Sequence, residues 1–101
     1  MIHQNDILLF TSVVDSGDDR CVMVAMEDEY VREGTPNQVK VKELNDWTPL
    51  GNIRTLEAAS FRVVGRVRPG DTRESIVRRI LPEDKWEFTL ELYRKNRGVA
   101  N

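Results

Sequence analysis

Reactive and metal-binding side chains are scarce in this chain. Its 101 residues include one cysteine, Cys21, and one histidine, His3. A structural zinc site takes four ligands, mostly cysteine and histidine, so the sequence excludes one built by this chain alone. A single cysteine also excludes an internal disulfide, which fits a reducing compartment. We therefore expect a cytoplasmic protein with no metal and no other cofactor.

Catalytic patterns are equally scarce. Nucleophilic catalysis by serine or cysteine needs a base, and the one histidine lies near the chain end, where we expect mobility. Cys21 lies in an apolar stretch, where a free cysteine usually acts as a small buried hydrophobe. No glycine-rich phosphate loop precedes a Lys-Ser or Lys-Thr pair. The sequence names no catalytic residue and favours a protein that is not an enzyme.

Long apolar runs are missing too. The run Ile7–Phe10 is too short for the core of a signal peptide, and Asp6 precedes it. No stretch approaches the roughly 18 apolar residues of a membrane span. We expect no contact with a membrane.

The composition suits one folded domain with an uneven charge. Apolar residues make up 40% and charged residues 32%, so we expect a single compact domain over residues 1–101. Residues 1–59 have a charge balance of −6 and residues 60–101 a balance of +4. Such asymmetry indicates either a surface for a charged partner or attraction between the two halves within one fold.

β-Branched and alternating stretches predict a sheet. Ile7–Val14 is apolar on both faces, which predicts a central strand, and Arg20–Met26 predicts its hairpin partner across the turn Asp15–Asp19. Val39–Leu44 alternates with two lysines, which predicts a half-exposed or edge strand. An edge strand there leaves the oligomeric state open, since it can pair with a second copy. Thr55–Ala59 indicates one helical turn.

The stretch Ser60–Asp71 predicts a strand with arginines on one face. Alternation places Phe61 and Val63 on one side, and the three arginines of the strand on the other. Gly65 marks a point where the sheet bulges or bends. The arginines of this face are Arg62, Arg66 and Arg68.

Two further segments follow the Pro69-Gly70 turn. Asp71–Leu81 predicts a helix, with Asp71 and Glu74 spaced as a capping box. Trp86–Tyr93 alternates between apolar and polar residues and predicts a strand, with a helix as the alternative. Together these elements predict an α+β fold: a small, strongly curved antiparallel sheet or an SH3-like barrel of four to five strands with one packed helix.

Arginine gives the strongest functional signal. Guanidinium groups recognise phosphates and carboxylates through paired hydrogen bonds. We call the predicted recognition groups the arginine surface: Arg62, Arg66, Arg68, Arg73, Arg78 and Arg79. Trp47 joins the candidate binding residues, because an exposed indole anchors interfaces, although it can instead fold back onto the core.

These features predict a small non-enzymatic regulatory or binding module that acts on a protein partner through its charged surface. Nucleic-acid binding by the same surface is the alternative, although the chain is not basic overall and its aromatic residues do not alternate with the arginines. A small metal-dependent hydrolase is a third hypothesis, based on the spacing of Asp71, Glu83 and Lys85.

Overall fold

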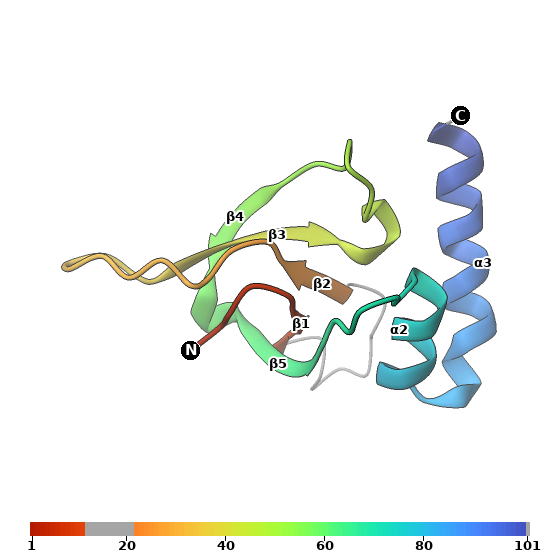
Figure 1. The fold of residues 1–101 in the computed structure, drawn as a ribbon, viewed down its shortest axis with the longest axis horizontal. Helices are drawn as coiled ribbons and strands as arrows, with labels where there is room; N and C mark the ends of the chain where they lie inside the picture. Colours follow the sequence, from red (N-terminus) through yellow and green to blue (C-terminus); the bar gives the residue numbers. More distant parts are fainter. Residues whose placement is uncertain (12–21, 101) are drawn as a thin grey trace.

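The fold is given by a computed structural model, which describes residues 1–11 and 22–100, with side chains as far as Lys95. The predicted turn Asp15–Asp19, the end of the first predicted strand and Cys21 lie outside the described residues. Figure 1 shows the sheet between two neighbouring helices at one end and a projecting loop, residues 26–37, at the other. In chain order the elements are β1 (Asp6–Phe10), β2 (Val22–Ala25), β3 (Gln38–Glu43), η1 (Leu44–Asp46), β4 (Arg54–Glu57), η2 (Ala58–Ser60), β5 (Phe61–Arg66), α2 (Arg73–Ile80) and α3 (Glu83–Ala100).

The five strands form one antiparallel sheet in the order β4-β3-β2-β1-β5. This confirms the predicted α+β class, whereas the prediction of a single helix is wrong because α3 is also helical. Strands β4 and β5 form the two ends of the sheet and do not pair with each other. The described sheet is therefore not closed, and the predicted barrel is not confirmed.

The N-terminal strands are the most accurately predicted part of the sheet. β1 pairs with β2 on one side and with β5 on the other, as expected of a central strand. Ile7 and Leu8 are both fully buried although successive residues of a strand point to opposite faces. The sheet is therefore covered on both faces at β1, as the apolar run predicts.

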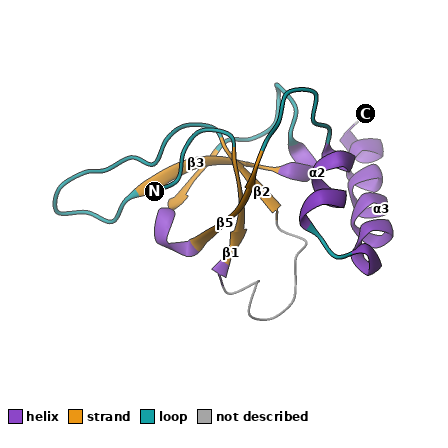
Figure 2. Cartoon of the chain, turned by 60° about the horizontal axis from the view of Figure 1, so that its bottom comes forward, coloured by secondary structure: helices purple, strands orange, loops and turns teal. Residues whose placement is uncertain are grey.

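Each face of the sheet has its own core. Helices α2 and α3 cover one face, and Figure 2 shows these helices and the projecting loop at opposite ends from a second side. We call the two groups the helix-side core and the opposite core. The helix-side core contains Ile7, Leu9, Val22, Val24, Leu44, Ile76, Val77, Leu81, Leu90 and Tyr93. The opposite core contains Ile2, Leu8, Met23, Ala25, Val39, Val41, Ala58 and Phe61.

Strand β3 corrects one prediction and β4 another. β3 lies between β2 and β4, so of the two alternatives for Val39–Leu44, a half-exposed strand or an edge strand, the edge strand is wrong. The segment Thr55–Ala59, predicted as a helical turn, instead begins within β4 and ends in the 3₁₀ turn η2. β4 has four residues, three of them polar, so its sequence shows little of the alternation that predicts a strand. Pairing of copies through β3 is excluded, because β4 covers that edge.

The two lysines of β3 differ in exposure, although the sequence predicts that both are at least partly exposed. Lys40 is exposed, whereas Lys42 is buried and its Nζ donates a hydrogen bond to the carbonyl oxygen of Thr48 at 2.7 Å. Lys42 thus holds the loop after η1 against the sheet. The aliphatic stem of a lysine can cover apolar surface while its ammonium reaches a polar atom.

We expect Lys42→Met to leave the free energy of unfolding within about 1 kcal/mol of wild type, because methionine keeps the packing of the stem and removes a costly buried charge. Lys42→Ala should lower it by about 2 kcal/mol, since it also removes the buried methylenes. Urea unfolding of both variants measures the difference. Equal losses in the two variants would show that the bond to Thr48, and not the packing, gives Lys42 its effect.

Helix α2 forms where the sequence predicts a helix, with a different cap. Its N-cap is Thr72, whose Oγ1 accepts a hydrogen bond from the backbone N–H of Ser75 at 3.1 Å. Ser75 Oγ in turn accepts one from the Thr72 N–H at 2.8 Å. The capping box therefore lies one residue later than the predicted pair of Asp71 and Glu74, because the Asp71 carboxylate is engaged elsewhere.

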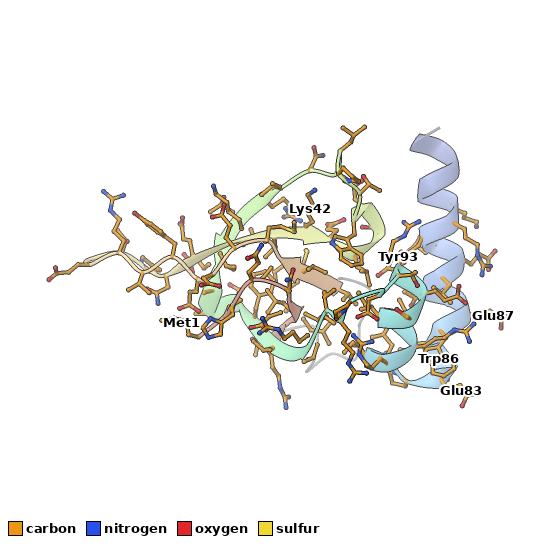
Figure 3. All side chains as sticks on the ribbon, viewed as in Figure 1. Met1, Lys42, Glu83, Trp86, Glu87 and Tyr93 are labelled. Atoms are coloured by element: carbon orange, nitrogen blue, oxygen red, sulfur yellow. The ribbon has the colours of Figure 1, made fainter. Side chains whose placement is uncertain are left out.

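Helix α3 replaces the strand predicted at Trp86–Tyr93. Four residues of its inner face repeat at i, i+3, i+4 and i+7, the spacing of one helical face. Figure 3 shows Trp86 and Tyr93 on the side facing the rest of the chain and Glu87 on the outer side. The acidic first turn, Glu83 and Asp84, favours a helix N-terminus. The inner-face residues are Trp86, Thr89, Leu90 and Tyr93.

Candidate binding surface

Strand β5 contains a register shift that changes the faces of its side chains. Leu8 pairs with Val63, whereas the preceding residue Ile7 pairs with Gly65. Val64 is therefore an extra residue on β5, as in a β-bulge. The irregularity predicted at Gly65 is confirmed.

The shift separates two arginines predicted to share a face. Arg62 pairs with Leu9, and Arg66 pairs with Asp6. Directly opposed residues share a face, and Asp6 and Leu9 lie three apart on β1, so they point to opposite faces. Arg62 and Arg66 are consequently on opposite sides of the sheet, and the prediction of one common face is wrong.

Arg66 is exposed and weakly paired. Its Nη1 lies 3.7 Å from Oδ1 of Asp6, and its side chain is 63% exposed. An exposed pair at this distance contributes little to stability. The Arg66 guanidinium is therefore available to a further anion.

Arg68 begins a rigid turn. The N–H of Asp71 donates to the Arg68 carbonyl at 3.0 Å, and Gly70 has a φ of +83°. With Pro69 before it, this is the pattern of a type II β-turn. The Arg68 N–H also donates to Oδ2 of Asp71 at 2.7 Å. The backbone of Arg68 is thus fixed, while its guanidinium is exposed and has no partner among residues 1–11 and 22–95.

Arg79 is a structural residue in this arrangement. Its Nη1 and Nη2 donate to Oδ1 and Oδ2 of Asp71 at 3.0 and 2.7 Å, and Nη2 also donates to the Arg66 carbonyl at 3.0 Å. The hydrogen bonds from Arg79 and from the Arg68 N–H hold the pKa of Asp71 well below its usual range. The same pair raises the pKa of Arg79. Arg79 therefore ties α2 to the end of β5.

Two more members of the arginine surface have intramolecular partners. Arg73 Nη1 donates to the carbonyl oxygen of Asn45 at 2.6 Å, which ties α2 to η1. Arg78 Nη2 donates to Oε1 of Glu74 at 2.6 Å, and its guanidinium lies 5.7 Å from the centre of the Trp86 ring. Of the six predicted arginines, Arg62 and Arg68 are thus the two without a side-chain partner in the described part of the chain.

A depression lies between the end of β5 and α2. Its floor is apolar, formed by half-buried side chains that also pack on the helix-side core. Gly65 leaves this floor open, since a Cβ there would lie 2.8 Å from Cδ1 of Ile80. Arg66, Arg68 and Arg79 are also among its lining residues. We call it the β5–α2 groove, with the apolar residues Val64, Val67, Pro69 and Ile80.

The apolar groove residues were not predicted as part of a site. Val64 and Val67 are three residues apart, so on a regular strand they would point to opposite faces. Both nevertheless pack against the helix-side core. The glycine at position 65 indicates a bulge, but nothing in the sequence tells which side chains it brings together.

Trp47 lies away from this groove. It is half-buried and packs against the helix-side core, so of its two predicted roles the core role is the one its contacts match. Its loop is closed by the Asn52 N–H, which donates to Oδ2 of Asp46 at 3.1 Å.

The described residues give little support to a metal site, to the hydrolase hypothesis or to a membrane span. Within residues 1–11 and 22–95, no three His, Cys, Asp or Glu side chains come together as a metal site would need. Asp71, a residue of the hydrolase hypothesis, is engaged by Arg79. Over the same part of the chain, neither helix has the length and apolar character to cross a bilayer.

Comparison with protein-family models, with curated proteins and with solved structures gave no match to this chain.

Proposed function

We propose that this protein is a small non-enzymatic binding module that recognises a protein partner through the exposed arginines of β5 and the following turn. The observation that carries the proposal is Arg68, whose backbone is fixed by Asp71 while its guanidinium lacks a partner among the described residues. A preorganised charged group loses little conformational entropy when it binds. Arg66 beside it, 63% exposed, adds a second guanidinium.

The part of the arginine surface that is open to a partner is smaller than the sequence predicts. Arg73 and Arg79 are bound to the chain itself, and Arg78 pairs with Glu74. A short basic patch suits one acidic segment better than a long phosphate backbone, which needs an extended run of positive charge. Protein recognition is therefore our first choice and nucleic-acid binding the alternative. A single cysteine supports a cytoplasmic location for this role.

We also propose that the sheet is curled towards a small barrel. In a flat five-stranded sheet the two edge strands lie about 19 Å apart. Glu57 ends one edge strand and Phe61 begins the other, four Cα steps later. Four steps span at most about 15 Å, and less through a 3₁₀ turn. The short connection supports an approach of the two edges at this corner.

The test is a pull-down from cells with tagged wild-type protein and two charge-reversal variants, with and without nuclease. We expect Arg66→Glu/Arg68→Glu to lose at least about 90% of a captured protein, because the reversed charges repel an acidic surface. Arg54→Glu, on the other edge strand, is the matched control and should retain it. Capture that disappears after nuclease treatment would favour the nucleic-acid alternative, and capture unchanged by the double variant would refute the proposal.

A further inference from the structure

The β5–α2 groove combines two properties that point to a particular kind of ligand. Apolar residues form its floor, and three arginines, Arg66, Arg68 and Arg79, are among its lining residues. Two carboxylates, Asp6 and Asp71, contact these arginines and reduce the local charge balance to +1. A net charge of +1 is neutralised by one carboxylate of a ligand, and apolar side chains of the same ligand can cover the floor. A polyanion would not contact the apolar floor.

The backbone of β5 limits how a ligand can bind there. β5 is an edge strand, and such a strand can accept a further strand from a partner. At the groove, however, the Arg66 carbonyl already accepts a hydrogen bond from Arg79. Strand addition is therefore blocked at this carbonyl, which favours recognition by side chains.

The two arginines differ in how firmly they are held. The Arg68 backbone is held on both sides by the turn to Asp71, whereas Arg66 has a 3.7 Å contact with Asp6. A guanidinium presents two parallel N–H groups to a carboxylate, which makes the geometry specific. Arg68 is consequently the anchor for an incoming carboxylate, and Arg66 is a second contact at the rim.

From this geometry we infer that the β5–α2 groove binds an acidic segment of a protein in which an aspartate or glutamate is flanked by apolar residues. This inference rests on the proposed function and specifies the chemistry of the partner. The carboxylate bonds to Arg68, and an apolar neighbour covers Val67 and Ile80. Arg79 stays with Asp71 and shapes the wall.

A titration of the ¹⁵N-labelled full chain followed by NMR tests the inference. The probe is a blocked seven-residue peptide with the central sequence leucine-aspartate-valine. We expect saturating shifts of the amides of residues 64–70 and 79–80. Arg68→Glu should weaken binding at least about tenfold, because it removes a charge-assisted hydrogen bond and adds repulsion. Arg62→Glu, a matched reversal on β5 outside the groove lining, should leave affinity within about twofold.

Control peptides show whether binding needs both the carboxylate and the apolar side chain. Peptides with asparagine for aspartate, or serine for leucine, should each bind at least about tenfold more weakly than the probe. Thermal melting of Arg68→Glu and of Arg68→Gln verifies that the turn still forms. No shift in the groove at about 10 mM probe would overturn the inference, as would tighter binding of an oligothymidine at the same amides.

The two proposals fail in different ways. A pull-down that depends on Arg66 and Arg68, combined with no peptide binding, would refute the acidic–apolar ligand and leave the binding module standing. Peptide binding in the groove with no captured protein would refute the module in cells and leave the groove chemistry in place.

Discussion

Asp71→Ala is expected to lower the free energy of unfolding at pH 7 by about 2–3 kcal/mol, which urea unfolding followed by circular dichroism would measure. The Asp71 carboxylate accepts hydrogen bonds from both terminal nitrogens of Arg79, from the Arg68 N–H and from Ser75 Oγ. Alanine leaves the Arg79 guanidinium, whose side chain is only 23% exposed, without its carboxylate. Because Arg79 keeps some water and its bond to the Arg66 carbonyl, we expect a loss at or below about 3 kcal/mol, the lower end of the range for a broken buried pair.

A matched control lies on the same helix. Glu74 and Arg78 form a pair of the same kind at 2.6 Å, but both side chains are more than half exposed. We expect Glu74→Ala to cost no more than about 0.5 kcal/mol, because water screens such pairs. Similar costs for Glu74→Ala and Asp71→Ala would show that the Asp71–Arg79 pair does not hold the turn to α2.

The same pair gives the protein a defined response to acid. The pKa of Asp71 is lowered in the folded state, mainly by the hydrogen bonds from Arg79. An unfolded aspartate titrates near about 3.9, so the stabilising contribution is complete above that pH and is lost as the pH falls towards the folded value. Between about pH 5 and pH 2 the wild type should therefore lose stability more steeply than Asp71→Asn. Parallel pH profiles for the two proteins would contradict this linkage.

The sequence predicts those parts of the fold that depend on neighbours along the chain. The apolar run at Ile7 identifies an internal strand, because burial on both faces leaves no polar positions. Pro69 and Gly70 identify the turn before α2, since the two residues have the backbone preferences of a type II turn. Both features depend on residues that are close together in the sequence.

Features that depend on pairing between distant segments were missed. Regular alternation predicts that Arg62 and Arg66 share a face of β5, whereas the extra residue Val64 moves Arg62 to the other side. Arg79 was predicted as a recognition group, although its carboxylate partner Asp71 lies eight residues earlier across a turn. A charged side chain has the same letter in the sequence whether its partner is another protein or its own chain.

The last segment shows how two periodicities can occur in one sequence. Trp86, Phe88 and Leu90 alternate with polar residues as a strand would, but Trp86 and Leu90 also fit one side of a helix. Packing against α2 and η1 selects the helix. Phe88 then points outward and is 59% exposed, whereas Leu90 is 9% exposed.

The difference in burial between Phe88 and Leu90 predicts a large difference in the cost of replacing them. In the helix, Leu90→Ala should lower the free energy of unfolding by about 2–4 kcal/mol, because it removes a buried side chain from the helix-side core. Phe88→Ala should change it by less than about 0.5 kcal/mol, since its ring is largely in water already. In a strand, both side chains would lie on one buried face and both substitutions would be costly. Urea unfolding of the two variants therefore distinguishes the two structures, and comparable losses would reject the helix at Glu83–Ala100.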